Sequence, residues 1–308
     1  MSRLYQNILE LVGRTPILSL NRVVPAGSGA VLVKLENRNP GGSVKDRVAL
    51  ALVEDAEARG QITQGGHMVY ATSGNSGVAL AMVAAVKGYR LTIFMPSNAP
   101  LNHRRLLQRY GVDVQLTSPS GGMAGAMRGA ETLASSGASS GNGALLLDFF
   151  GNPEAVEVHY SDTAAEILQA VGGTVDGFVS GVGTGATLVG VGRRLKESNP
   201  LVQVVAVEPA NSPILSGGQA GRHMIPGIGP DFLPPLLDSA IIDSVTRVSD
   251  SQANEMALRL AREDGLLAGI SSGANVVVAI QIAEDLGHGK TVVTLLPDTG
   301  ERYLDFPI

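Results

Sequence analysis

Lys45 is the residue of this sequence best suited to act as a chemical reagent. It lies in residues 39–47 (NPGGSVKDR), just after a glycine-serine turn at which a helix is predicted to begin. A solvated lysine has a pKa of about 10.4, but burial and a helix amino terminus both disfavour its charged form. A lysine in such a place can form a Schiff base. The plain alternative is a solvated lysine paired with Asp46 or Glu36, and the segment alone leaves both open.

Two glycine-rich turns each follow an apolar run and open a predicted helix. Residues 72–77 (TSGNSG) offer backbone N–H groups and hydroxyls that suit a carboxylate or phosphate, or else simply cap the helix. Residues 181–187 (GVGTGAT) match a dinucleotide motif only weakly, because they lie mid-chain, and they lack the Lys-Ser/Thr pair of a Walker loop. A phosphate held by amides and by the Thr184 and Thr187 hydroxyls is the better interpretation, with a structural turn as the alternative.

Residues 269–274 (GISSGA) form a third candidate turn. A serine hydroxyl here either caps a helix or donates a neutral hydrogen bond to a heteroaromatic nitrogen. The histidines and carboxylates lack the spacing of a metal site, so no metal is expected.

The elements that must position these residues alternate along the chain. Apolar runs separated by alanine- and leucine-rich stretches predict β-α-β units and a mainly parallel sheet, with ligands at the carboxyl ends of strands. The strand candidates are residues 31–35, 68–71, 91–95, 112–116, 145–147, 178–180, 202–207 and 292–296. Residues 135–143 and 151–153 are predicted loops, and the lobe boundary is placed beside the second.

Composition narrows the class of protein. The 308 residues are 44% hydrophobic and 17% charged with 39 glycines, which is typical of an α/β protein with two lobes. A net charge of −5 gives no indication of the basic surface that binds nucleic acid. Because the sequence has no cysteine, disulfides and thiolate sites are excluded. Residues 1–11 lack a signal-peptide pattern and no apolar stretch could span a bilayer, so a cytoplasmic protein is expected.

Taken in order, these segments resemble the cysteine synthase (O-acetylserine sulfhydrylase) and cystathionine β-synthase group of fold-type II pyridoxal phosphate enzymes. The matching segments extend over nearly the whole chain. They are residues 13–16 (GRTP), 34–40 (KLENRNP), 43–47 (SVKDR), 72–75 (TSGN), 183–187 (GTGAT), 225–229 (IPGIG), 269–274 (GISSGA) and 300–304 (GERYL).

The resemblance implies a two-lobed fold like that of tryptophan synthase β, each lobe an open, mainly parallel twisted sheet flanked by helices. Residues 1–152 would form a smaller mobile domain, with about 13–34 crossing to the other lobe. Residues 153–308 would form a larger domain that binds the cofactor phosphate. A homodimer is also implied.

The resemblance also assigns roles. Lys45 would carry pyridoxal 5'-phosphate as a Schiff base, Asn75 would bond the ring oxygen, and Ser272 would face the pyridine nitrogen. The phosphate would be held by Gly183, Thr184, Gly185 and Thr187. The substrate would be held by Thr72, Ser73, Asn75, Ser76 and Gly227.

The implied reaction is β-replacement on an activated L-serine derivative, O-acetylserine above all, through an aminoacrylate, with sulfide as the nucleophile and L-cysteine as the product. Alternatives are cystathionine β-synthase or another nucleophile (an amine, homocysteine or thiosulfate), and next a serine/threonine dehydratase. A non-catalytic paralogue that binds C-terminal peptides is the alternative outside enzymology, and a nucleotide-binding protein is a weaker one.

The chain departs from the family pattern at three places. Phe149 stands where relatives have glutamine, residues 98–103 (NAPLNH) replace a Thr-Met-Ser segment near the second-substrate entrance, and Ser76 replaces threonine. The first two departures put sulfide in doubt, whereas Ser76 is a milder change. The family's partner is the isoleucine-ending tail of a serine acetyltransferase, and the terminal Ile308 of this chain suggests that its own tail contacts a neighbouring molecule's site.

Overall fold

The computed structural model describes residues 4–136 and 143–305, and the chain divides into two compact units. The first unit comprises Met1–Val12 and Lys45–Phe149, and the second comprises Gly13–Val44 and Phe150–Ile308. The chain therefore enters the second unit at Gly13, leaves it at Lys45 and returns at Phe150. The predicted domain roles, a mobile small domain and a cofactor-binding large one, stay a prediction.

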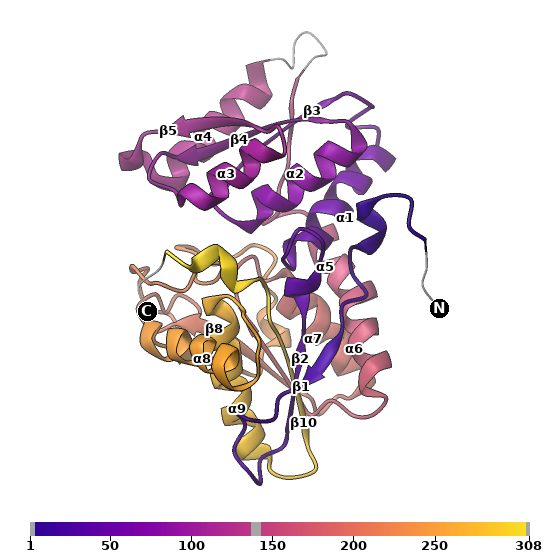
Figure 1. Ribbon diagram of the computed structural model, residues 1–308, viewed down its shortest axis with the longest axis vertical. Helices are drawn as coiled ribbons and strands as arrows, with labels where there is room; N and C mark the ends of the chain where they lie inside the picture. Colours follow the sequence, from indigo (N-terminus) through magenta and orange to yellow (C-terminus); the bar gives the residue numbers. More distant parts are fainter. Residues whose placement is uncertain (1–3, 137–142, 306–308) are drawn as a thin grey trace. The chain divides into compact units, whose positions relative to one another are not determined.

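The first unit is built on a four-stranded parallel sheet in the order β5-β4-β3-β6 (Figure 1). Its strands are β3 (His67–Ala71), β4 (Arg90–Pro96), β5 (Asp113–Thr117) and β6 (Leu145–Leu146). Its helices are α1 (Lys45–Ala58), α2 (Asn75–Lys87), α3 (Leu101–Arg109) and α4 (Gly122–Ser136), with short 3-10 turns η1 (Ile8–Leu11) and η3 (Pro119–Gly121). Val69 and Ala71 of β3 pack against Ala126 and Ala130 of α4, so Tyr70 between them points to the opposite face.

The second unit holds a six-stranded sheet in the order β1-β2-β10-β7-β8-β9, parallel except for β1. Its strands are β1 (Ile17–Ser19), β2 (Ala30–Lys34), β7 (Gly177–Gly181), β8 (Gln203–Pro209), β9 (Ser244–Val248) and β10 (Thr291–Leu295). Its helices are α5 (Glu154–Val158), α6 (Ala164–Val171), α7 (Ala186–Ser198), α8 (Asp250–Glu263) and α9 (Ile270–Leu286), with a π-helical turn η5 (His159–Thr163) and 3-10 turns η2 (Glu36–Arg38), η6 (Ser239–Ile241) and η7 (Gly300–Tyr303).

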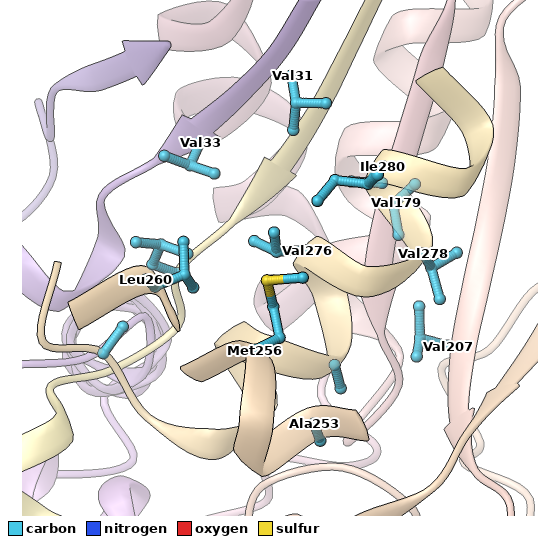
Figure 2. Packing of buried hydrophobic residues seen from close by; sticks show 14 of the residues in the cluster. Val31, Val33, Val179, Val207, Ala253, Met256, Leu260, Val276, Val278 and Ile280 are labelled. Atoms are coloured by element: carbon cyan, nitrogen blue, oxygen red, sulfur yellow. The ribbon is translucent and has the colours of Figure 1, made fainter. Parts of the chain in front are cut away.

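The strands of this sheet bury both faces. In β8, Val205 and Val207 belong to one core cluster with α8 and α9, while Val204 and Ala206 belong to a second cluster with α6 and α7. Figure 2 shows the first cluster, in which Met256 and Leu260 of α8 approach strand and α9 valines. The predicted α/β class with mainly parallel sheets is confirmed.

The structure also corrects local predictions. Strands β1 and β9 were not predicted from the sequence, and α2 begins at Asn75 rather than at Val78. The predicted loop over residues 135–143 is wrong at its start, because Ser135 and Ser136 close α4, where each hydroxyl bonds a backbone carbonyl of the preceding turn. Residues 137–142 of that loop lie outside the described residues.

Two further predictions concern location and partners. Within residues 4–136 and 143–305, no helix has the length and apolar character needed to cross a membrane. The cytoplasmic location stays a prediction. The role suggested for the chain end falls on Ile308, which lies outside the described residues.

A buried ion pair holds the crossing segment of the second unit to α6. The Lys34 side chain is fully buried, its Nζ lies 2.6 Å from Glu166 Oε2, and it also donates to the Thr15 carbonyl. Glu166 Oε1 in turn accepts the Arg14 N–H at 2.8 Å. Removing one member of such a pair leaves the other with an uncompensated charge or an unsatisfied acceptor.

We expect Lys34→Met to lower the free energy of unfolding by about 3 kcal/mol, because Glu166 and the Thr15 carbonyl lose their partner. Urea unfolding followed by circular dichroism measures this change. Lys290→Met is the matched control, since the Lys290–Asp176 pair at 3.0 Å is half exposed and its loss should cost less than about 1 kcal/mol. Equal effects of the two substitutions would contradict the prediction.

Candidate active site

Lys45 differs from the other lysines in its position. It is the first residue of α1 and is followed by the buried Asp46 and Arg47. The other four lysines lie elsewhere in the fold, each with its Nζ close to a carboxylate oxygen. The pairs are Lys34–Glu166 at 2.6 Å, Lys87–Glu57 at 2.8 Å, Lys196–Asp243 at 2.7 Å and Lys290–Asp176 at 3.0 Å.

The loop of residues 72–76 lies in the same unit as Lys45, between β3 and α2. Its entry is fixed by the Thr72 N–H, which donates to the Phe94 carbonyl at 3.0 Å, and Thr72 Oγ1 accepts the Gly74 N–H at 3.1 Å. Thr72, Ser73, Asn75 and Ser76 are all half-buried. Because α2 begins at Asn75, the positive end of its helix dipole lies at this loop, a place that suits an anion.

A buried aromatic pair lies beside this loop. The rings of Tyr70 and Phe149 have centroids 4.9 Å apart, and Phe149 is fully buried. Burial, and next the charge of Asp148, hold the pKa of Tyr70 well above its usual value, while a hydrogen bond with the Ser76 side chain acts in the opposite direction. The tyrosine therefore stays neutral and its hydroxyl contacts the loop. Two of the departures noted in the sequence, Phe149 and Ser76, thus share Tyr70 as a neighbour.

In the second unit the turn between β7 and α7 is shaped by close backbone approach. A Cβ on Gly183 would lie 2.4 Å from the Gly227 carbonyl oxygen, so the two predicted site segments are in direct contact. Gly185 precedes α7 with a φ of +84°, and the Ala186 N–H donates to Thr184 Oγ1 at 3.3 Å. The turn thus places Gly183, Thr184 and Gly185 at the amino terminus of a thirteen-residue helix, a place that suits a phosphate.

Two buried residues that were not predicted as site residues support this turn. His159, fully buried in the π-helical turn, lies 3.1 Å from Thr187 Oγ1 through Nε2 and 2.9 Å from Thr163 Oγ1 through Nδ1. Asn275 of α9 accepts the Gly181 N–H at 2.7 Å. Asn275 lies one helical turn after Ser272, which is the only pattern that could have drawn attention to it.

Ser272 is fully buried in the first turn of α9. In the described part of the chain its Oγ has no hydrogen-bond partner. A buried hydroxyl without a partner is unfavourable, so this one fits a ligand acceptor such as a ring nitrogen. The donor at Ser272, the glycine turn and the position of Lys45 therefore all fit pyridoxal phosphate.

Comparison with known proteins decides the family. The model of the family described as "Pyridoxal-phosphate dependent enzyme" matches residues 8–298. The chain belongs to this family. It is 47% identical over 303 residues to a cysteine synthase of Staphylococcus aureus (strain N315), covering 98% of this chain and 96% of that one.

Solved structures of other relatives have the same fold. An O-ureido-L-serine synthase is similar with a TM-score of 0.93 and 42% identity, covering 98% of this chain and 94% of the other. An O-acetylserine dependent cystathionine β-synthase from Helicobacter pylori is similar with a TM-score of 0.92 and 35% identity, covering 100% and 99%. These likenesses confirm fold type II and the pyridoxal phosphate dependence that the sequence predicted.

We expect Gly183→Ala to weaken pyridoxal phosphate binding by at least about tenfold, because the new methyl would force the Gly227 backbone away by roughly an ångström. The dissociation constant is measured by titrating cofactor into the stripped protein and following visible absorbance. Gly173→Ala is the control, since its nearest contact would be 3.9 Å away. Unchanged cofactor affinity of the Gly183 variant would contradict the assignment of this turn as the phosphate site.

Tyr70→Phe should loosen the 72–76 loop while leaving the ring against Phe149. Loss of a neutral hydrogen bond should speed amide exchange in residues 72–77 by about fivefold to tenfold, which hydrogen-exchange mass spectrometry measures. Tyr89→Phe is the control, because its hydroxyl donates at 2.6 Å to Glu57 rather than to the loop. If both variants leave exchange of the loop unchanged, Tyr70 does not hold it.

Proposed function

We propose that this protein catalyses β-replacement on an activated L-serine derivative, O-acetylserine in the first place, with sulfide as the nucleophile and L-cysteine as the product. The observation that carries the proposal is the full-length likeness to a cysteine synthase, 47% identical over 98% of the chain. The structure supports it through the buried Ser272 hydroxyl, which has no hydrogen-bond partner in the described part of the chain.

The residues are assigned as follows. Lys45 would hold the cofactor through its aldehyde carbon, Asn75 would bond its ring oxygen, and Ser272 would donate to its ring nitrogen. Gly183, Thr184, Gly185 and Thr187 hold the phosphate through amides and hydroxyls. When bound, pyridoxal phosphate withdraws electrons from the α-carbon of an amino acid.

The chain's own groups then handle the substrate. The amides and hydroxyls of Thr72, Ser73, Asn75 and Ser76 bind its α-carboxylate, and Gly227 lies by its amine. The Lys45 amine, released when the substrate amine takes its place on the cofactor, would take the proton from the α-carbon and return it after the β-substituent has left and the nucleophile has added at the β-carbon. Because Ser272 is a neutral donor, it does not stabilise a positive ring nitrogen as an aspartate would, which favours loss of the β-substituent over transamination.

A second candidate is the same reaction with a different nucleophile. It is favoured by Phe149, a fully buried apolar residue whose ring packs against Tyr70 at a tilt, beside the proposed substrate loop. The names of the two solved relatives also show that this fold serves other β-replacements. Residues 98–103, which lead into α3, are where an altered second-substrate entrance is expected. A homodimer and binding of a serine acetyltransferase tail also remain proposals.

The proposal is tested by mixing O-acetylserine, O-phosphoserine or serine with sulfide, homocysteine, thiosulfate or an amine, and identifying products by mass. We expect O-acetylserine with sulfide to give L-cysteine fastest, and Lys45→Ala to abolish turnover because the residue that moves the α-proton is gone. Lys87→Ala, which removes an ion-paired lysine of the same unit, should leave turnover unchanged. A product of another nucleophile would favour the second candidate, and no product from any pair would refute both.

A further inference from the structure

The segment Pro297–Tyr303, which follows β10 in the second unit, contacts two of the stretches that lead into proposed cofactor contacts. One is residues 41–44, which end immediately before Lys45. The other is residues 267–272, which contain Ser272 at the start of α9. We call Pro297–Tyr303 the C-terminal brace.

The brace holds residues 41–44 through their backbone. The Val44 N–H donates to the Pro297 carbonyl at 2.8 Å, and Ser43 forms an antiparallel bridge with Asp298. The Arg302 guanidinium donates to the Gly41 carbonyl. These contacts fix the backbone up to the residue that precedes Lys45.

The brace holds the start of α9 in the same way. The Gly269 N–H donates to the Asp298 carbonyl at 3.0 Å, Ala268 bridges Thr299, and the Ser272 N–H donates back to Gly269 at 2.9 Å. A Cβ on Gly269 would lie only 2.0 Å from Asp298 Oδ1, so no side chain fits between Gly269 and the Asp298 carboxylate. Asp298 therefore touches both stretches, one on each side.

The side chains of the brace are themselves fixed. Asp298 is 2% exposed and Arg302 is 8% exposed. The Tyr303 hydroxyl donates to Asp298 Oδ2, so Tyr303 fixes the orientation of the Asp298 carboxylate. Breaking the hydrogen bonds of buried polar groups such as these is unfavourable, and the arrangement is therefore rigid.

We propose that the C-terminal brace sets the separation between the backbone of residues 41–44, which leads into Lys45, and the Ser272 hydroxyl, with Tyr303 and Arg302 as positioning residues. The inference rests on the proposed function in so far as Lys45 and Ser272 engage one cofactor. A ring that is attached at one side and hydrogen-bonded at the other tolerates only small errors in that separation.

Tyr303→Phe tests the proposal, since it removes only the hydroxyl that reaches Asp298. We expect the cofactor dissociation constant to rise about fivefold or more, because the lysine and the ring nitrogen donor are no longer held at the separation that the cofactor requires. For the same reason, the pH at which the visible band of the holoenzyme changes should shift. Tyr160→Phe is the matched control, for its hydroxyl donates at 2.8 Å to the exposed Glu197 of the same unit.

Arg302 supplies a graded series. Arg302→Lys keeps an N–H donor within reach of the Gly41 carbonyl, whereas Arg302→Met removes it. The affinity for the cofactor should fall in the order wild type, lysine variant, methionine variant. If the methionine variant does not fold, the lysine variant and Tyr303→Phe still decide the matter.

Hydrogen exchange in the cofactor-free protein gives a readout independent of activity. Tyr303→Phe should speed amide exchange in residues 42–44 and 269–272 together, and Tyr160→Phe in neither. Wild-type exchange in both stretches, or a wild-type dissociation constant and visible band in both Tyr303→Phe and Arg302→Lys, would overturn the brace. Wild-type protein that binds cofactor but converts no donor would refute the proposed function while leaving this inference standing.

Discussion

The parallel pairing of β2 with β10 is the constraint on which the rest of the structure depends. It joins Ala30–Lys34 to Thr291–Leu295, so a strand from near the start of the chain lies inside the sheet of the second unit. The Leu296 N–H continues the pairing by donating to the Lys34 carbonyl at 2.9 Å. Residues 41–44 therefore lead from this pairing to α1. The position of the Lys45 backbone at the start of α1 follows from a long-range strand pairing rather than from local helix propensity.

A second principle is the use of neutral donors at the proposed cofactor contacts. The proposed phosphate turn offers amides and the hydroxyls of Thr184 and Thr187, and the proposed ring nitrogen donor is Ser272. The four lysines other than Lys45 form ion pairs with carboxylates, as Lys34 does with Glu166. Neutral donors bind an anion without adding charge that would pull electrons further into the ring, which agrees with β-replacement rather than transamination.

Much of this could be predicted from the sequence, for definite reasons. Buried parallel strands are continuous apolar runs, so residues 31–35 and 202–207 were recognisable as strands. Edge strands carry no such signal: in β9 only Val248 is buried, and Ser244 and Arg247 are exposed. The position of Lys45 after a glycine-serine turn was likewise visible, because the turn chemistry is local.

The supporting residues could not be predicted, because their partners are distant in the chain. Asn275 bonds Gly181, which is 94 residues away, and His159 contacts Thr187, which is 28 residues away. Arg302 reaches Gly41 across 261 residues. No local pattern encodes such contacts, and only the folded sheet brings these groups together.

The central claim is that Lys45 carries the cofactor, and chemical trapping tests it most directly. Borohydride reduction of the holoenzyme, followed by proteolysis and peptide mass mapping, fixes the cofactor to whichever amine held it. The account predicts a pyridoxyl group on Lys45 alone among the five lysines. A label on Lys34, Lys87, Lys196 or Lys290, or no label at all on cofactor-saturated protein, would contradict it.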